Sequence, residues 1–130
     1  MPRLLHIQSS PNFANSVTRV LSEKFVETWK RNHANVEIDM LDLATTPPPH
    51  FGAENLQAFA HTPEKQTPEM RAAVALSDSL IKQLEAADIV VIASPMINFT
   101  ITSQLKAWFD HVTIAGRTFQ YSAPGVAKGL

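Results

Sequence analysis

The chain of 130 residues contains no cysteine, and only four glycines. The first absence excludes disulfides, thiolate metal ligands and a cysteine nucleophile, and it agrees with a reducing compartment. None of the glycines forms the phosphate loops GxGxxG or GxxxxGK[ST]. No apolar run is long enough for a membrane-spanning helix, and the N-terminus lacks the apolar core of a signal peptide. These absences predict a cytoplasmic protein that does not associate with membranes.

An excess of either charge is missing too. Eleven Lys and Arg residues stand against twelve Asp and Glu residues, for a net charge of -1. This balance provides no long-range attraction for nucleic acid. The five histidines show no spacing typical of metal ligands, and no serine lies in a GxSxG motif, so neither a metal site nor hydrolase chemistry is predicted.

What the sequence does contain is an alternation of strand and helix patterns. Strands are predicted over Leu4–Gln8, over residues 36–40 and at the apolar run that begins at Ile89. Between and after them lie helices that begin at Ser16, at Thr67-Pro68 and near residue 101, with residues 45–52 as a loop. In the first helix, apolar residues at helical spacing predict a buried stripe: Val17, Val20, Leu21, Phe25 and Trp29. Such alternation predicts a parallel sheet with the first strand between the second and the third.

The third predicted strand is apolar without alternation, which is typical of a strand inside a parallel sheet. The expected order nevertheless places it at an edge. Residues 117–130 do not supply a convincing fourth strand, because Pro124, Gly125 and Gly129 interrupt the brief alternation around Phe119. We therefore expect either that a C-terminal part is missing, which we favour, or that another chain covers this edge.

Two loops follow the first and third strands, and both should lie at the carboxyl edge of the sheet. The loop of residues 9–15 leads to a helix start, where amides and hydroxyls attract anions such as phosphate. From the loop alone, simple capping of the helix by Asn15 or Ser16 is the favoured interpretation. The turn at residues 95–99 could aim backbone groups at a planar ligand, or could merely reverse the chain. In open α/β sheets such neighbouring loops share one ligand.

Several segments resemble the FMN-dependent NADH-azoreductases and NADH:quinone oxidoreductases. The resemblance extends from the first strand to about Leu130, over roughly the first two-thirds of the family's fold. It is carried by Gln8-Ser9-Ser10, residues 25–29, residues 75–81, Pro95-Met96-Ile97-Asn98-Phe99, residues 103–110 and residues 115–121. It implies a flavodoxin-like three-layer α/β sandwich with a parallel sheet, in a single domain over residues 1–130 that stops after the third strand and its following helix.

The resemblance also implies a cofactor and its ligands. The phosphate and ribityl chain of FMN would contact Ser10, Ser16, Val17 and Thr18. The isoalloxazine ring would contact Met96, Ile97, Asn98 and Phe99. The family is typically homodimeric, and the segment around Phe119 and Tyr121 is expected near a flavin. Where Ile97 stands the family commonly has Tyr, so substrate preference or flavin potential is expected to differ.

The implied activity is a two-electron, ping-pong reduction of quinones and azo compounds with NADH as the donor. FMN carries the hydride chemistry, so no side chain is assigned a catalytic role. Two alternatives remain open from the sequence. One is a non-enzymatic electron carrier of the flavodoxin type, which a net charge of -1 does not favour. The other is a fragment that binds nothing, since part of the family's flavin pocket lies beyond the region of resemblance.

Overall fold

The computed structural model describes all residues from 1 to 130. The contacts divide the chain into two compact units, residues 1–48 with 83–106, and residues 49–82 with 107–130. No helix combines the length and the hydropathy that crossing a bilayer requires. The elements follow one another as β1 (Arg3–Gln8), α1 (Val17–Asn32), β2 (Glu37–Asp42), α2 (Ala53–Ala60), a 3-10 turn (Pro63–Lys65), α3 (Pro68–Glu85), β3 (Ile89–Ala93), α4 (Ser103–Val112), β4 (Phe119–Ala123) and β5 (Val126–Gly129).

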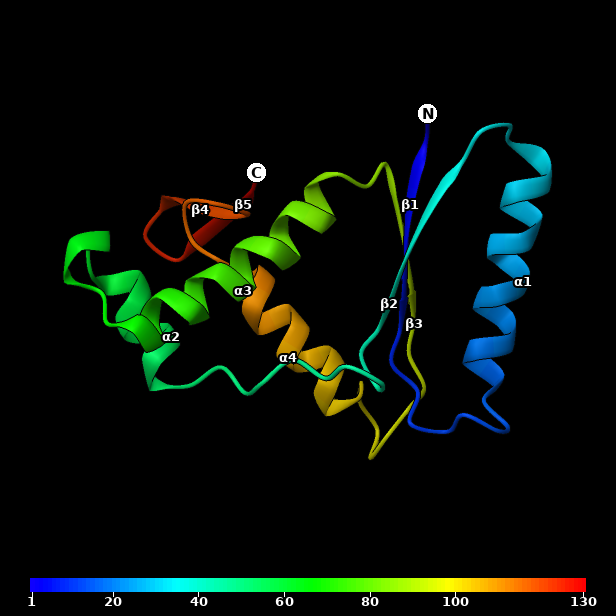
Figure 1. Ribbon diagram of the computed structural model, residues 1–130, viewed down its shortest axis with the longest axis horizontal. Coiled ribbons are helices and arrows are strands. Elements are labelled where there is room, and N and C mark those ends of the chain that lie inside the picture. The colour runs from blue at the N-terminus through cyan, green and yellow to red at the C-terminus, as the bar shows by residue number, and fades with distance from the viewer. The chain divides into compact units, whose positions relative to one another are not determined.

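The first unit is built on a three-stranded parallel sheet (Figure 1). Strand β1 lies between β2 and β3, as predicted, and its Leu4, Leu5 and Ile7 are completely buried. The register pairs Gln8, at the end of β1, with Asp42 on one side and with Ala93 on the other. The carboxyl ends of all three strands therefore lie at one edge of the sheet.

Helix α1 forms where predicted, but its apolar stripe is not buried. Val17 is 71% exposed and Leu21 is 61% exposed, while Ser22 and Val26 are buried. The reason lies in β1, which presents His6 and Gln8 to the helix: the Ser22 hydroxyl lies 2.8 Å from His6 Nε2 and accepts a hydrogen bond from Gln8 Nε2 at 2.9 Å. The helix therefore turns a polar residue toward the sheet and leaves the stripe beside it exposed.

The two outer strands agree only in part with their patterns. Strand β2 is an edge strand, as the predicted strand order requires, and its apolar residue Met40 is exposed. Strand β3 lies at the opposite edge, and Val90 and Ile92 on it are more than one-third exposed. The interior position that the apolar composition of β3 predicts is therefore not reached within residues 1–130.

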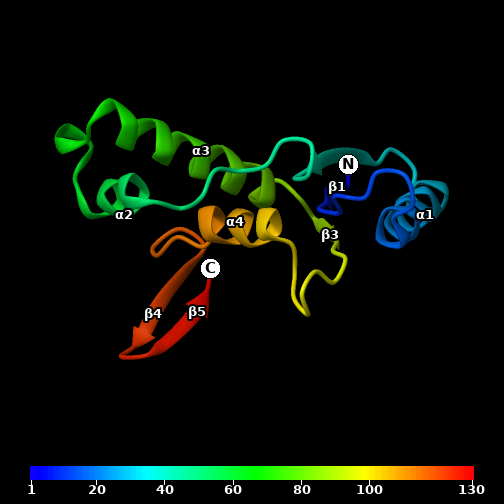
Figure 2. The same ribbon diagram turned by 90° about the horizontal axis from the view of Figure 1, so that it is seen from below.

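The second unit contains α2 and an antiparallel hairpin of β4 and β5 (Figure 2), neither of which was predicted. Helix α2 has only eight residues and begins after Gly52, whose amide donates to Asn55 Oδ1 at 2.9 Å. The hairpin turns at Gly125, which has a φ of 75°. Pro124 and Gly125 are thus the residues of a turn between two short strands, where the sequence pattern indicated only an interruption.

Helices α3 and α4 each bury one face. In α3, Met70, Ser77 and Ile81 are buried. In α4, the buried residues include Leu105, Trp108 and Val112. Thr67 Oγ1 accepts from the amide of Met70 at 3.2 Å, which confirms the helix start predicted at Thr67-Pro68.

Candidate functional site

A cavity of about 370 Å³ opens at the carboxyl edge of the parallel sheet. It lies between the turn after β1 and the turn after β3, both within the first unit. The two turns therefore lie side by side and share one cavity. Its lining residues are Ser10, Pro11, Asn12, Asn15, Ser16, Val17, Thr18, Pro95, Met96 and Ile97.

Six of the eight residues singled out from the sequence line this cavity, namely Ser10, Ser16, Val17, Thr18, Met96 and Ile97. Asn98 lines a neighbouring cavity of about 610 Å³ beside the start of α4, and Ile97 takes part in both. Phe99 lines neither of these two cavities, and its side chain is 95% exposed. The structure thus brings together the residues of the first turn with two of the second.

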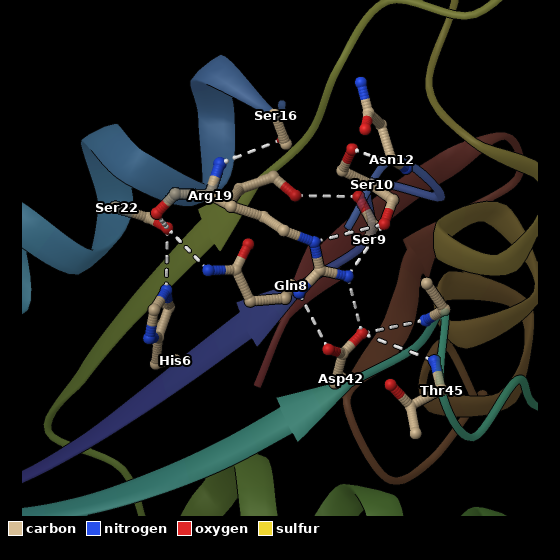
Figure 3. A network of polar contacts seen from close by, with 12 residues as sticks. His6, Gln8, Ser9, Ser10, Asn12, Ser16, Arg19, Ser22, Asp42 and Thr45 are labelled. Carbon is tan, nitrogen blue, oxygen red and sulfur yellow. Dashed lines mark hydrogen bonds and ion pairs between the residues drawn. The ribbon is translucent and has the colours of Figure 1, made fainter. Parts of the chain in front are cut away.

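The first turn is held in place by hydrogen bonds of its own polar side chains (Figure 3). The buried Ser9 hydroxyl donates to the carbonyl of Ala93 at 2.7 Å, which ties the end of β1 to the end of β3. Asn12 Oδ1 accepts from the amides of Ala14 and Asn15 at 3.2 and 3.0 Å. These bonds give the loop a defined shape before any ligand is present.

Ser16 is the N-cap of α1, because its hydroxyl accepts a hydrogen bond from the amide of Arg19 at 3.2 Å. Capping of the helix by Ser16 is thus confirmed. Capping does not compete with anion binding, because Val17 and Thr18 belong to the first helical turn of α1. The N–H groups of that turn have no acceptor within the helix. Val17 and Thr18 line the cavity at the positive end of the helix dipole.

Arg19 lies directly behind the loop, and the sequence analysis did not single it out. Its Nη2 and Nε donate to the carbonyl oxygen of Ser10 at 2.7 and 3.2 Å. Its Nη1 and Nη2 donate to the two carboxylate oxygens of Asp42 at 2.8 and 3.0 Å. The guanidinium also lies over the ring of Phe13, 4.7 Å from the centroid. No local sequence pattern joins these residues, because the sheet register brings Asp42 beside β1.

The contacts and the burial of the charged and titratable groups in this network shift their pKa values. The hydrogen bond from Arg19 lowers the pKa of Asp42 below its ordinary value, and the same bond raises the pKa of Arg19. Burial lowers the pKa of His6 below its ordinary value of 6.5. The Ser22 hydroxyl donates to the Arg19 carbonyl at 3.1 Å, so His6 Nε2 must be the donor to Ser22. His6 therefore has a proton on Nε2, and its burial disfavours the charged form of the ring.

The second turn is held by backbone hydrogen bonds between Ile97 and Thr100, at 2.8 and 3.1 Å. The two residues between them, Asn98 and Phe99, have φ values of 49° and 66°. Positive φ at both central positions is typical of a type I′ turn, which ordinarily contains Gly. A phenylalanine in this conformation is strained, and its side chain has no burial to compensate. Such strain at an exposed aromatic residue is typical of functional sites.

Comparisons with known proteins agree with this architecture. The family model described as "Flavodoxin-like fold" matches residues 2–130. An FMN-dependent NADH:quinone oxidoreductase of Marinomonas sp. (strain MWYL1) is 45% identical over 125 residues, which are 96% of this chain and 64% of that protein. The crystal structure of an azoreductase from Bacillus anthracis str. Sterne matches with a TM-score of 0.90 and 30% identity, covering 100% of this chain and 64% of the other.

An FMN-dependent NADH-azoreductase from Bacillus anthracis str. Ames Ancestor, crystallised in complex with FMN, matches with a TM-score of 0.86 and 27% identity. That likeness covers 100% of this chain and 63% of the other. The chain thus spans a little less than two-thirds of the length of these relatives. The flavodoxin-like α/β fold predicted from the sequence is confirmed.

Proposed function

Because the chain belongs to the family of proteins with the flavodoxin-like fold, we propose that its cavity binds FMN for an NADH-dependent reduction of quinones and azo compounds. The observation that carries this proposal is the shared cavity between the turns after β1 and β3. The names of the relatives supply the reaction: an FMN-dependent NADH:quinone oxidoreductase and an FMN-dependent NADH-azoreductase. Residues 1–130 belong, in this proposal, to a single flavodoxin-like domain.

The two turns offer the two kinds of surface that FMN requires. The phosphate and ribityl chain contact Ser10 and Ser16–Thr18, where hydroxyls and amides meet the positive end of α1. The ring contacts the second turn, where Met96 is 73% exposed and therefore available to a planar ligand. Asn98 and Phe99 do not line this cavity. In this proposal they contact the ring from the same turn, outside the cavity.

FMN, when bound, supplies the hydride chemistry, and the chain supplies binding and orientation. The first turn fixes the phosphate end of the ligand, and the second turn fixes the plane of the ring. No side chain of the site is assigned a proton-transfer role, since solvent reaches the open side of the turn. Ile97 lines both cavities, so it would contact the ring and could also contact an acceptor in the neighbouring cavity.

The assembly and the location follow from the same proposal. We expect a homodimer, with the segment around Phe119 and Tyr121 near a flavin site, and a cytoplasmic location where NADH is available. Tyr121 is exposed, as a residue that contacts a second subunit would be in one isolated subunit. Analytical ultracentrifugation of the protein checks the dimer: a monomer at micromolar concentration would contradict it.

Titration of the protein with FMN tests the proposal. We expect quenching of flavin fluorescence, a yellow protein, and steady oxidation of NADH when a soluble benzoquinone or an azo dye is added. Flavin binding without NADH oxidation would favour the electron carrier instead. An unchanged flavin spectrum together with no consumption of NADH would contradict the proposed function.

A further inference from the structure

We propose that Arg19 is a positioning residue of the phosphate seat, which consists of Ser10 and Ser16–Thr18. Arg19 holds the loop of residues 10–16 in the shape that binds an anion. This inference rests on the proposed function. Arg19 does not line the cavity. It therefore acts through the loop residues that do, and not by contact with the ligand.

The contacts of Arg19 reach the loop at three points. Its guanidinium donates twice to the carbonyl of Ser10, at the beginning of the loop, and packs over Phe13, in the middle. The amide of Arg19 donates to Ser16, at the end of the loop. One residue thus contacts the loop at its start, its centre and its end. Figure 3 shows the contacts with Ser10 and Ser16. The side chain is only 12% exposed, so its position is fixed by packing as well.

Asp42 anchors this residue to the sheet. Both of its carboxylate oxygens accept hydrogen bonds from the guanidinium, and Oδ1 also accepts from the amides of Ala44 and Thr45 at 3.1 and 3.4 Å. The bidentate geometry requires the planar guanidinium, which an ammonium group cannot reproduce. The shape of the loop is in this way linked to the end of β2.

The ion pair makes it possible to distinguish two roles of Arg19: positioning of the loop and electrostatic attraction of the phosphate. Arg19 and Asp42 together carry no net charge, so the pair adds little long-range attraction for a phosphate. If the charge of Arg19 were its main contribution, removal of the Asp42 carboxylate would unmask that charge and strengthen FMN binding. If Arg19 holds the loop, Asp42→Asn loosens it and weakens FMN binding.

The test compares the affinity for FMN with that for riboflavin, which has the same ring and no phosphate. We expect Arg19→Gln to weaken FMN binding about tenfold or more, because it removes charge-assisted hydrogen bonds that order the loop. Riboflavin affinity should change less than about twofold, because riboflavin has only the neutral ribityl chain to contact this loop and its ring contacts the other turn. Arg19→Lys should not restore FMN affinity, and Asp42→Asn should lower it. Lys24→Gln, which removes the same charge from an exposed position of α1, should change neither.

Phe13→Leu provides a variant that does not threaten the fold, because Phe13 is exposed. We expect it to weaken FMN binding about threefold and to leave riboflavin binding unchanged, through loss of the ring under the guanidinium. Equal losses for both flavins, or an unchanged FMN affinity in the Arg19 and Phe13 variants, would overturn the role of Arg19. Tighter FMN binding by Asp42→Asn would also overturn it. A native protein that binds neither flavin would instead overturn the proposed function, on which this inference depends.

Discussion

The two turns of the site are stabilised in different ways. The turn after β1 is held by hydrogen bonds of side chains. The Ser9 hydroxyl donates to the neighbouring strand β3, and the guanidinium of Arg19 donates to the carbonyl of Ser10. The turn after β3 is held by a pair of backbone hydrogen bonds between Ile97 and Thr100, and its side chains extend away from the chain. The turn after β1 is ordered by a network of polar side chains. The turn after β3 has a strained backbone and exposed apolar side chains.

This difference matches the two ends of the proposed ligand. A phosphate is recognised by donors that are fixed before binding, because reorganising them would reduce the electrostatic gain. A flat ring is recognised by apolar area and shape, for which exposed side chains such as Met96 and Phe99 suffice. Changes in the first turn should therefore alter the affinity for FMN much more than that for riboflavin, and changes in the second should alter both affinities alike.

The largest expected effect follows from a negative charge in the first turn. Asp is as good an N-cap as Ser, so Ser16→Asp should keep α1 intact. A carboxylate about 4 Å from a phosphate repels each of its charges by about 4 kcal/mol at an effective dielectric of 20. We expect FMN affinity, measured by fluorescence titration, to fall by about 100-fold or more.

Riboflavin and a neutral variant serve as the controls for that change. Ser16→Asn also caps the helix but carries no charge, so its FMN affinity should stay within about threefold of the native value. Equal losses of FMN and riboflavin in Ser16→Asp would show that the substitution damages the fold and does not act at a phosphate seat.

Substitutions in the strained turn after β3 should affect FMN and riboflavin equally. Phe99→Gly should raise the free energy of unfolding by about 1 kcal/mol, because Gly adopts a positive φ without steric strain. It should also weaken both flavins alike, since the aromatic contact is lost. Asn98→Gly is the matched control and should stabilise less, because Asn tolerates this conformation better than Phe. Urea denaturation measures both, and a destabilised Phe99→Gly would argue against the strain.

Ile97 allows the second turn to be tested for substrate preference. Ile97→Tyr adds an aromatic face and a phenol between the two cavities that Ile97 lines. We expect kcat/KM for quinones relative to azo dyes to change by about threefold or more, and any change in FMN affinity to be matched by the same change in riboflavin affinity. An unaltered ratio of the two rates would place Ile97 away from the acceptor.

The smallest effect concerns the buried histidine beneath the first turn. Burial lowers the pKa of His6 in the folded state below 6.5, so the unfolded chain binds more protons between the two values. Stability should therefore be complete above about pH 6.5 and decline as the pH falls toward the folded pKa. The carboxylate of Asp42, whose pKa is lowered, titrates at more acidic pH and does not interfere. His6→Gln should remove the His6 contribution to the decline below pH 6.5 in thermal melts, and an unchanged decline would contradict this origin.

The sheet and its carboxyl edge could be predicted from the sequence because the governing patterns are local. Apolar runs mark β1 and β3, and the alternation of strand and helix sets their order. The exposed stripe of α1 could not be predicted, since the polarity of His6 and Gln8 on the facing strand decides which helix face is buried. Arg19 escaped for a similar reason: the register of β1 and β2, not the sequence spacing, brings Asp42 to it.

The central claim is that the two turns bind the two ends of one phosphorylated, planar ligand. Amide spectra of the isotope-labelled protein titrated with FMN and with riboflavin test it most directly. We predict that FMN shifts the amides of Val17 and Thr18 together with those of Ile97 and Asn98, whereas riboflavin, which has the ribityl chain but no phosphate, shifts the second pair as strongly and the first pair much less. Shifts by FMN at one turn alone, or only within residues 49–82, would contradict it.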